Sequence, residues 1–325
     1  QVDVPVTVVA GLYDHHLEGT LLGYERLNDE TKAQSRLILG PWNHGYGITP
    51  SHVTTDHAGD INVARDTFNW FYSILVNDTV PEANVQVYFV EEDEWVTLDN
   101  WPIQADGSET YYFTTQQSPH NGDALVLSPE AQAEEDTVTY VYDPQDPVMS
   151  VGGETLFTSV SKRGSQPQPE IGYRDDVISF LSDPLTEDLT IAGKISADLY
   201  VSTDVDDTCF TYKVSEVAPD GTTYNIRSGI TTLAYRNDSL GDRQSYTPND
   251  LVEITIETLP ITWNVKAGNS IRVDITSSNF PEYSIHSNYA GIWSEQTQTR
   301  VADQTIYIGP DHPSSISFPT LDLGD

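Results

Sequence analysis

Two residues that could act together in catalysis each follow a short apolar segment. Asp14 ends the motif Gly-Leu-Tyr-Asp after the apolar run 4–10, and His44 ends Gly-Pro-Trp-Asn-His after the run 36–40. Short continuous apolar runs are typical of strands that are buried on both faces of a parallel sheet. Because neighbouring parallel strands end at the same edge of a sheet, we expect the Asp14 carboxylate within hydrogen-bonding reach of one His44 ring nitrogen.

An Asp and a His in this chain order can serve a serine nucleophile. The carboxylate fixes the tautomer of the imidazole and stabilises the imidazolium, while the imidazole takes the proton of the serine hydroxyl. One class of hydrolase places the three residues in the order Ser, Asp, His. The spacing alone leaves a second interpretation open, in which Asp14 caps the helix that follows and His44 is an ordinary loop residue.

The first hundred residues contain the elements that would position this pair. Apolar side chains at helical spacing predict helices over 16–28 and 60–77, the second with Asp60 as its N-cap. The order strand, helix, strand, helix is typical of a parallel sheet covered by helices. Two buried strands cannot form such a sheet by themselves, so we expect most of the sheet to lie N-terminal to Gln1.

From about residue 106 the pattern changes to alternation of apolar and polar residues. The clearest alternating run covers residues 189–201. Further alternating runs lie at 137–142, 210–217, 224–233, 250–258 and 271–277. Many strands with few helices favour a β-sandwich, of the jelly-roll type. We therefore predict an α/β domain over residues 1–105 and an all-β jelly-roll domain over residues 106–325.

The Asp and His motifs resemble the acid and base motifs of the family that contains cocaine esterases, X-Pro dipeptidyl-peptidases and α-amino-acid ester hydrolases. Further blocks that resemble the family follow in the same order, at 142–148 with Gly152-Gly153, at 174–177, at 277–281 and at 309–314. The resemblance implies the C-terminal part of an α/β-hydrolase domain, followed by a galactose-binding-like jelly roll. It also implies hydrolysis of a small ester, amide or dipeptide through an acyl-enzyme, with Asp14 and His44 as catalytic residues.

The family's nucleophile motif Gly-x-Ser-x-Gly is absent from the 325 residues. In the family this motif, the oxyanion-hole tyrosine and a helical cap all precede the Asp strand. The resemblance therefore implies that the serine comes from an N-terminal hydrolase segment or a companion chain, and that this chain alone is inactive. A non-catalytic binding or structural protein built on the galactose-binding-like jelly roll is the alternative.

The resemblance also implies which residues face the substrate. His16, Leu156 and Phe157 would line the substrate pocket, although core packing is an equal interpretation for Leu156 and Phe157. His15, His52 and His57 have no ligand-like spacing, and we expect them at the surface. We predict no metal site and no cofactor, because the acidic cluster 204–207 is weak evidence for calcium in so acidic a chain.

The charge of the chain is far from balanced. Fifty Asp and Glu residues face fifteen Lys and Arg residues, for a formal net charge of −35. Such a charge repels nucleic acid and anionic membranes, so we expect neither as a partner. The acidic residues are spread along the chain, which favours adaptation to high salt, and we expect the cytoplasm of a salt-accumulating halophile rather than secretion. A second copy of the chain stays open as a partner.

Overall fold

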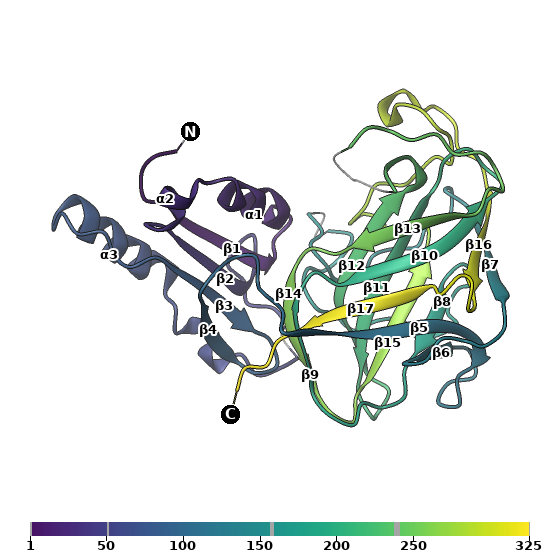
Figure 1. The fold of residues 1–325 in the computed structure, drawn as a ribbon, viewed down its shortest axis with the longest axis horizontal. Helices are drawn as coiled ribbons and strands as arrows, with labels where there is room; N and C mark the ends of the chain where they lie inside the picture. The colour runs from purple at the N-terminus through teal and green to yellow at the C-terminus, as the bar shows by residue number, and fades with distance from the viewer. Residues whose placement is uncertain (1, 51, 157–158, 237–240, 325) are drawn as a thin grey trace.

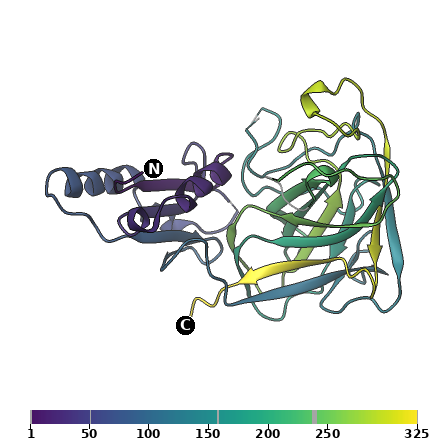
Figure 2. The same cartoon turned by 45° about the horizontal axis from the view of Figure 1, so that its top comes forward.

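The computed structural model describes residues 2–50, 52–156, 159–236 and 241–324. A small sheet with its helices lies at one end of the molecule, and a larger, almost entirely antiparallel sheet lies at the other (Figures 1 and 2). One apolar core runs through both sheets. Within the described ranges, no helix is long and apolar enough to cross a membrane.

The small sheet has the strand order β1-β2-β3-β4. Strands β1 (Thr7–Tyr13), β2 (Arg36–Asn43) and β3 (Asn84–Phe89) are parallel, and β4 (Glu94–Leu98) runs antiparallel to β3. The two strands that the sequence predicts are therefore present, and β1 and β2 each continue three residues further than expected. Strands β3 and β4 were not predicted from the sequence.

Three helices accompany this sheet. They are α1 (Leu17–Glu25), α2 (Asp29–Lys32) and α3 (Val63–Leu75), and a 3-10 turn covers Asp56–Gly59. Helix α1 packs on β1 through Leu17, Leu21 and Tyr24. Helix α3 projects from the end of the molecule (Figure 1). Most of its apolar side chains, Phe68 and Leu75 among them, are exposed.

The N-cap of α3 differs from the prediction. Asn62, not Asp60, caps the helix, and its side-chain oxygen accepts a hydrogen bond from the Arg65 backbone N–H at 3.0 Å. The Asp60 carboxylate instead lies 2.9 Å from His57 Nδ1. The ion pair holds Asp60 in the preceding turn, so the helix begins two residues later.

The larger sheet contains thirteen strands among the described residues. They are β5 (Gly107–Gln117), β6 (Leu125–Ser128), β7 (Asp136–Tyr142), β8 (Ile178–Leu181), β9 (Leu189–Gly193), β10 (Ser196–Thr203), β11 (Cys209–Val217), β12 (Thr223–Thr232), β13 (Val252–Glu257), β14 (Ile261–Val265), β15 (Ser270–Thr276), β16 (Ala302–Ile308) and β17 (Ser315–Thr320). Short 3-10 turns cover Leu233–Tyr235 and Trp293–Glu295. This arrangement fits a β-sandwich, while the jelly-roll topology and the domain boundary at residue 105 stay predictions.

The alternating run 189–201 forms two strands rather than one. Gly193 has a φ of 134°, which L-residues with a side chain rarely adopt, and the chain turns there between β9 and β10. Strand β9 then pairs with β14, whereas β10 pairs with β13, β16 and β17. The break places β9 and β14 next to the small sheet.

Backbone hydrogen bonds join the two parts of the molecule. The Val90 N–H donates to the Thr262 carbonyl and the Asn264 N–H donates to the Val90 carbonyl, both at 3.1 Å. The residue after β3 is therefore bound to β14 like a strand neighbour. This contact fixes the small sheet, and the residues at its C-terminal edge, against the sandwich.

Candidate functional site

The sequence-predicted pair lies at the C-terminal edge of the small sheet. Strands β1 and β2 pair in parallel from Thr7 opposite Arg36 to Tyr13 opposite Asn43, so the next residues, Asp14 and His44, emerge side by side. His44 Nδ1 lies 3.2 Å from each Asp14 carboxylate oxygen. The expected contact is therefore present, whereas the catalytic role of the two residues stays a prediction.

The Asp14 carboxylate is oriented by its own turn. Asp14 Oδ1 accepts a hydrogen bond from the His16 backbone N–H at 2.9 Å, and the Asp14 N–H donates to the Gly11 carbonyl at 3.1 Å. The Asp14 side chain is 16% exposed and that of His44 is 53% exposed. When the Nδ1–H of His44 donates a hydrogen bond to Asp14, the lone pair of Nε2 is free to accept a proton.

A glycine allows the two motifs to approach each other. A Cβ at Gly11 would overlap the carbonyl group of Trp42, so only glycine permits this spacing between the ends of β1 and β2. On the β2 side, Asn43 Oδ1 accepts hydrogen bonds from Gly45 N–H at 3.0 Å and Gly47 N–H at 3.2 Å. These bonds close the loop that carries His44.

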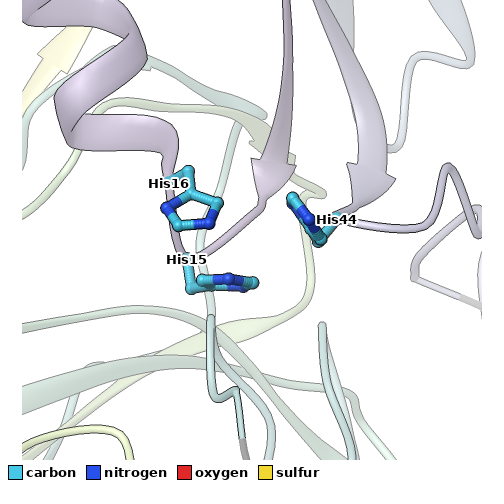
Figure 3. Close-up of side chains that lie close together, drawn as sticks. All are labelled: His15, His16 and His44. Atoms are coloured by element: carbon cyan, nitrogen blue, oxygen red, sulfur yellow. The ribbon is translucent and has the colours of Figure 1, made fainter.

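His15 and His16 join His44 at the site. The ring centroids are 4.1 Å apart for His15 and His16, 4.7 Å for His15 and His44, and 4.9 Å for His16 and His44. Figure 3 shows the three rings between the strand ends and the start of α1. Burial, with the neighbouring His16 second, lowers the pKa of His15. The surface position expected for His15 is therefore wrong, because its side chain is only 16% exposed.

An open hollow of about 620 Å³ is lined by Asp14, His15, His16 and His44, among others. His16 lines this hollow, and its position in a substrate pocket stays a prediction. A second hollow, of about 730 Å³, lies beside the first and is lined by His15, Glu154 and Glu282, with other residues of the sandwich. The motifs gave no signal for Glu154 or Glu282 at this place, because both come from the distant sandwich.

The structure places the remaining residues that the sequence singled out as follows. Leu156 is 53% exposed, so core packing is wrong for this residue, and its role at the pocket stays a prediction. Phe157 lies outside the described residues. His57 is exposed as expected, but His52 is not, because its ring stacks on Tyr224 with centroids 3.5 Å apart.

The acidic cluster at 204–207 has protein partners for each carboxylate. Asp204 accepts a hydrogen bond from the Asp303 N–H, Asp206 pairs with Arg300, and Asp207 accepts one from the Ala234 N–H. Hydrogen bonds within the sandwich therefore account for the cluster.

Comparison with known proteins identifies the family. The sequence family of the X-Pro dipeptidyl-peptidase C-terminal non-catalytic domain matches residues 76–317. The chain belongs to this family. Asp14 and His44 both precede residue 76, so they lie outside the range matched by the non-catalytic domain.

Individual relatives match most of the chain, including the residues that precede this domain. The cocaine esterase of Rhodococcus sp. (strain MB1 Bresler) is 29% identical, over 98% of this chain and 56% of that protein. An aminopeptidase from the marine sediment archaeon Thaumarchaeota archaeon has the same fold, with a TM-score of 0.81 and 23% identity over 98% of this chain and 55% of that one. An α-amino acid ester hydrolase also has this fold, with a TM-score of 0.78. Its sequence is 23% identical, over 99% of this chain and 56% of that one.

The resemblance inferred from the motifs is therefore confirmed, and the relatives are esterases and other hydrolases. The chain spans about half the length of the curated relatives it matches.

Proposed function

We propose that this chain supplies the Asp and His of a Ser-His-Asp hydrolase that cleaves small esters or amides, of the acyl esterase or X-Pro dipeptidyl-peptidase type. The observation that supports the proposal is the Asp14–His44 contact at the edge of an open hollow. In this proposal the small sheet is the last part of an α/β-hydrolase sheet, and the sandwich is a jelly roll.

Each residue has a defined step in the proposed reaction. His44 Nε2 takes the proton of the serine hydroxyl while the serine oxygen attacks the substrate carbonyl carbon. Asp14 stabilises the imidazolium, and His44 then donates the proton to the leaving alcohol or amine as the acyl-enzyme forms. Water repeats the same steps and releases the acid. The serine belongs to a preceding segment or a companion chain.

Two exposed features support a place for the serine-bearing segment. Strand β1 is an edge strand that pairs only with β2 among the described residues, which leaves its other side open for a further parallel strand. Helix α3 exposes Phe68, Phe71, Tyr72 and Leu75 on a helix that touches little else. Apolar side chains gathered in this way are typical of a surface that another segment covers.

Labelling with a fluorophosphonate that carries a reporter group tests the proposal. We expect the reagent to label the serine-bearing segment in the complete enzyme, and His44→Ala to abolish the labelling because the serine loses its base. His57→Ala is the matched control, since His57 is exposed and also lies beside a carboxylate, Asp60, and it should label normally. Labelling of residues 1–325, or normal labelling of His44→Ala, would contradict the proposal.

A second candidate is a non-catalytic binding or structural protein built on the sandwich. The observation in its favour is the family description itself, because the matched domain is described as non-catalytic. This candidate predicts no fluorophosphonate labelling of any segment that purifies with the chain.

A further inference from the structure

Three histidine rings lie close together at the site. One ring nitrogen of each of His15, His16 and His44 lies within 4.8 Å of the others. The rings are inclined to one another at 48°, 52° and 70° rather than stacked, so their edges can converge (Figure 3). Neither the His15 ring nor the His16 ring forms a hydrogen bond with another described residue. His15 Nδ1 lies 3.7 Å from Asp14 Oδ1, beyond hydrogen-bonding distance, so a cation could take the place of the proton in this contact.

The carboxylate beside the cluster has the position of a supporting group in a metal site. A histidine that binds a metal commonly donates its other ring N–H to a carboxylate, which fixes the ring and raises the basicity of the ligating nitrogen. Asp14 holds His44 in this way through Nδ1, at 3.2 Å. Nε2 of His44 is then the nitrogen that carries the lone pair.

The spacing of the ring nitrogens and the acidic residues of the hollow also suit a cation. Ligand nitrogens on a tetrahedral Zn²⁺ are about 3.3 Å apart, so the rings need to close by at most about 1.5 Å, which the exposed side chains of His16 and His44 permit. Asp14 and Glu18 line the hollow, and no Lys or Arg of the described residues does so. Because the hollow is open, solvent can fill a fourth coordination position.

We propose that His15, His16 and His44 form a binding site for a transition-metal ion of the Zn²⁺ type, which imidazole ligands favour. The bound metal takes the Nε2 lone pair of His44, the same lone pair that accepts the serine proton. Metal binding and general-base catalysis therefore exclude each other, and Zn²⁺ is a reversible inhibitor of the hydrolase. This second step rests on the proposed function, whereas the metal site itself does not.

Calorimetric titration of the complete, metal-free protein with ZnCl₂ tests the site without using activity. We expect one Zn²⁺ per chain at the cluster. His15→Gln and His16→Gln each remove one ligand and should weaken binding at least about tenfold, since even the loss of a supporting group costs about 10–100-fold. The matched control is His57→Gln, which removes an exposed histidine beside a carboxylate and should bind Zn²⁺ as the wild type does.

The inhibition is measured as the ratio of ester hydrolysis with Zn²⁺ to hydrolysis without it, in each variant. For the wild type and His57→Gln, the Zn²⁺ concentration at half-inhibition should equal the calorimetric dissociation constant. His16→Gln should raise the half-inhibition concentration and the dissociation constant by the same factor. Equal affinity in wild type, His15→Gln and His16→Gln would overturn the metal site. Normal Zn²⁺ binding without inhibition, or a gain of activity with Zn²⁺, would overturn the proposal that metal binding and general-base catalysis exclude each other. An enzyme inactive without Zn²⁺ would contradict the proposed function and leave the calorimetric result intact.

Discussion

Arg227 is a buried contact between the sandwich and the strand that carries Asp14. Its Nη1 donates to the Leu12 carbonyl at 2.7 Å and its Nη2 donates to the Pro260 carbonyl at 2.6 Å. It also pairs with Glu154, and its guanidinium lies 5.3 Å from the centroid of the Tyr13 ring. The side chain is 0% exposed. Arg227 on β12 therefore holds the end of β1 directly before Asp14.

We predict that Arg227→Met lowers the free energy of unfolding by about 3–5 kcal/mol. Methionine replaces the aliphatic stem but donates no hydrogen bond, so two buried carbonyls and the Glu154 carboxylate lose their partner. Removing one partner from a buried ion pair costs about 3–5 kcal/mol. Two hydrogen bonds from a charged donor, at about 1.5–3 kcal/mol each, give a similar figure.

Urea denaturation followed by tryptophan fluorescence measures the change. The control is Arg65→Met, which removes a surface ion pair with Asp66 and should cost less than about 1 kcal/mol. In the double variant Arg227→Met with Glu154→Gln, the carboxylate is no longer left charged without its partner. The double variant should therefore lose at least about 1 kcal/mol less than the sum of the single variants.

Two results would contradict a stabilising role for the Arg227 contact. If Arg227→Met costs no more than Arg65→Met, the buried hydrogen bonds to the end of β1 do not stabilise the protein. If the effects of Arg227→Met and Glu154→Gln simply add, the two side chains do not interact.

Three further predictions concern catalysis, pH and salt. Asp14→Asn should lower kcat for ester hydrolysis by the complete enzyme on the order of 10⁴-fold, because the amide favours the wrong His44 tautomer; a loss below about tenfold would contradict this. Burial lowers the pKa of His52 to about 4, so between that pH and about 6.5 the unfolded chain binds more protons than the folded one. The free energy of unfolding should therefore fall as pH decreases through this window, and His52→Phe, which keeps the stack on Tyr224, should reduce the slope; an unchanged slope would exclude His52 as its cause. The −35 charge predicts that the melting temperature rises steeply between about 0.1 M and about 3 M KCl, and a constant melting temperature would argue against adaptation to high salt.

Local sequence determined the parts of the site that depend on strand ends. Apolar runs placed two buried parallel strands, and parallel pairing then brought Asp14 and His44 to one edge without further information. Alternation likewise indicated β11, β12, β13 and β15 close to their observed bounds. These inferences succeed because burial on one or two faces of a strand leaves a period in the sequence that is independent of distant residues.

Only the tertiary structure decided which distant parts of the chain meet around the small sheet. His52 stacks on Tyr224, and Arg227 binds Leu12, across 172 and 215 positions of the chain. His15 is partly buried and lies beside residues of the sandwich, which its own neighbours in sequence do not encode. Such contacts depend on which surfaces of two folded parts meet, and periodicity describes each surface but not its partner.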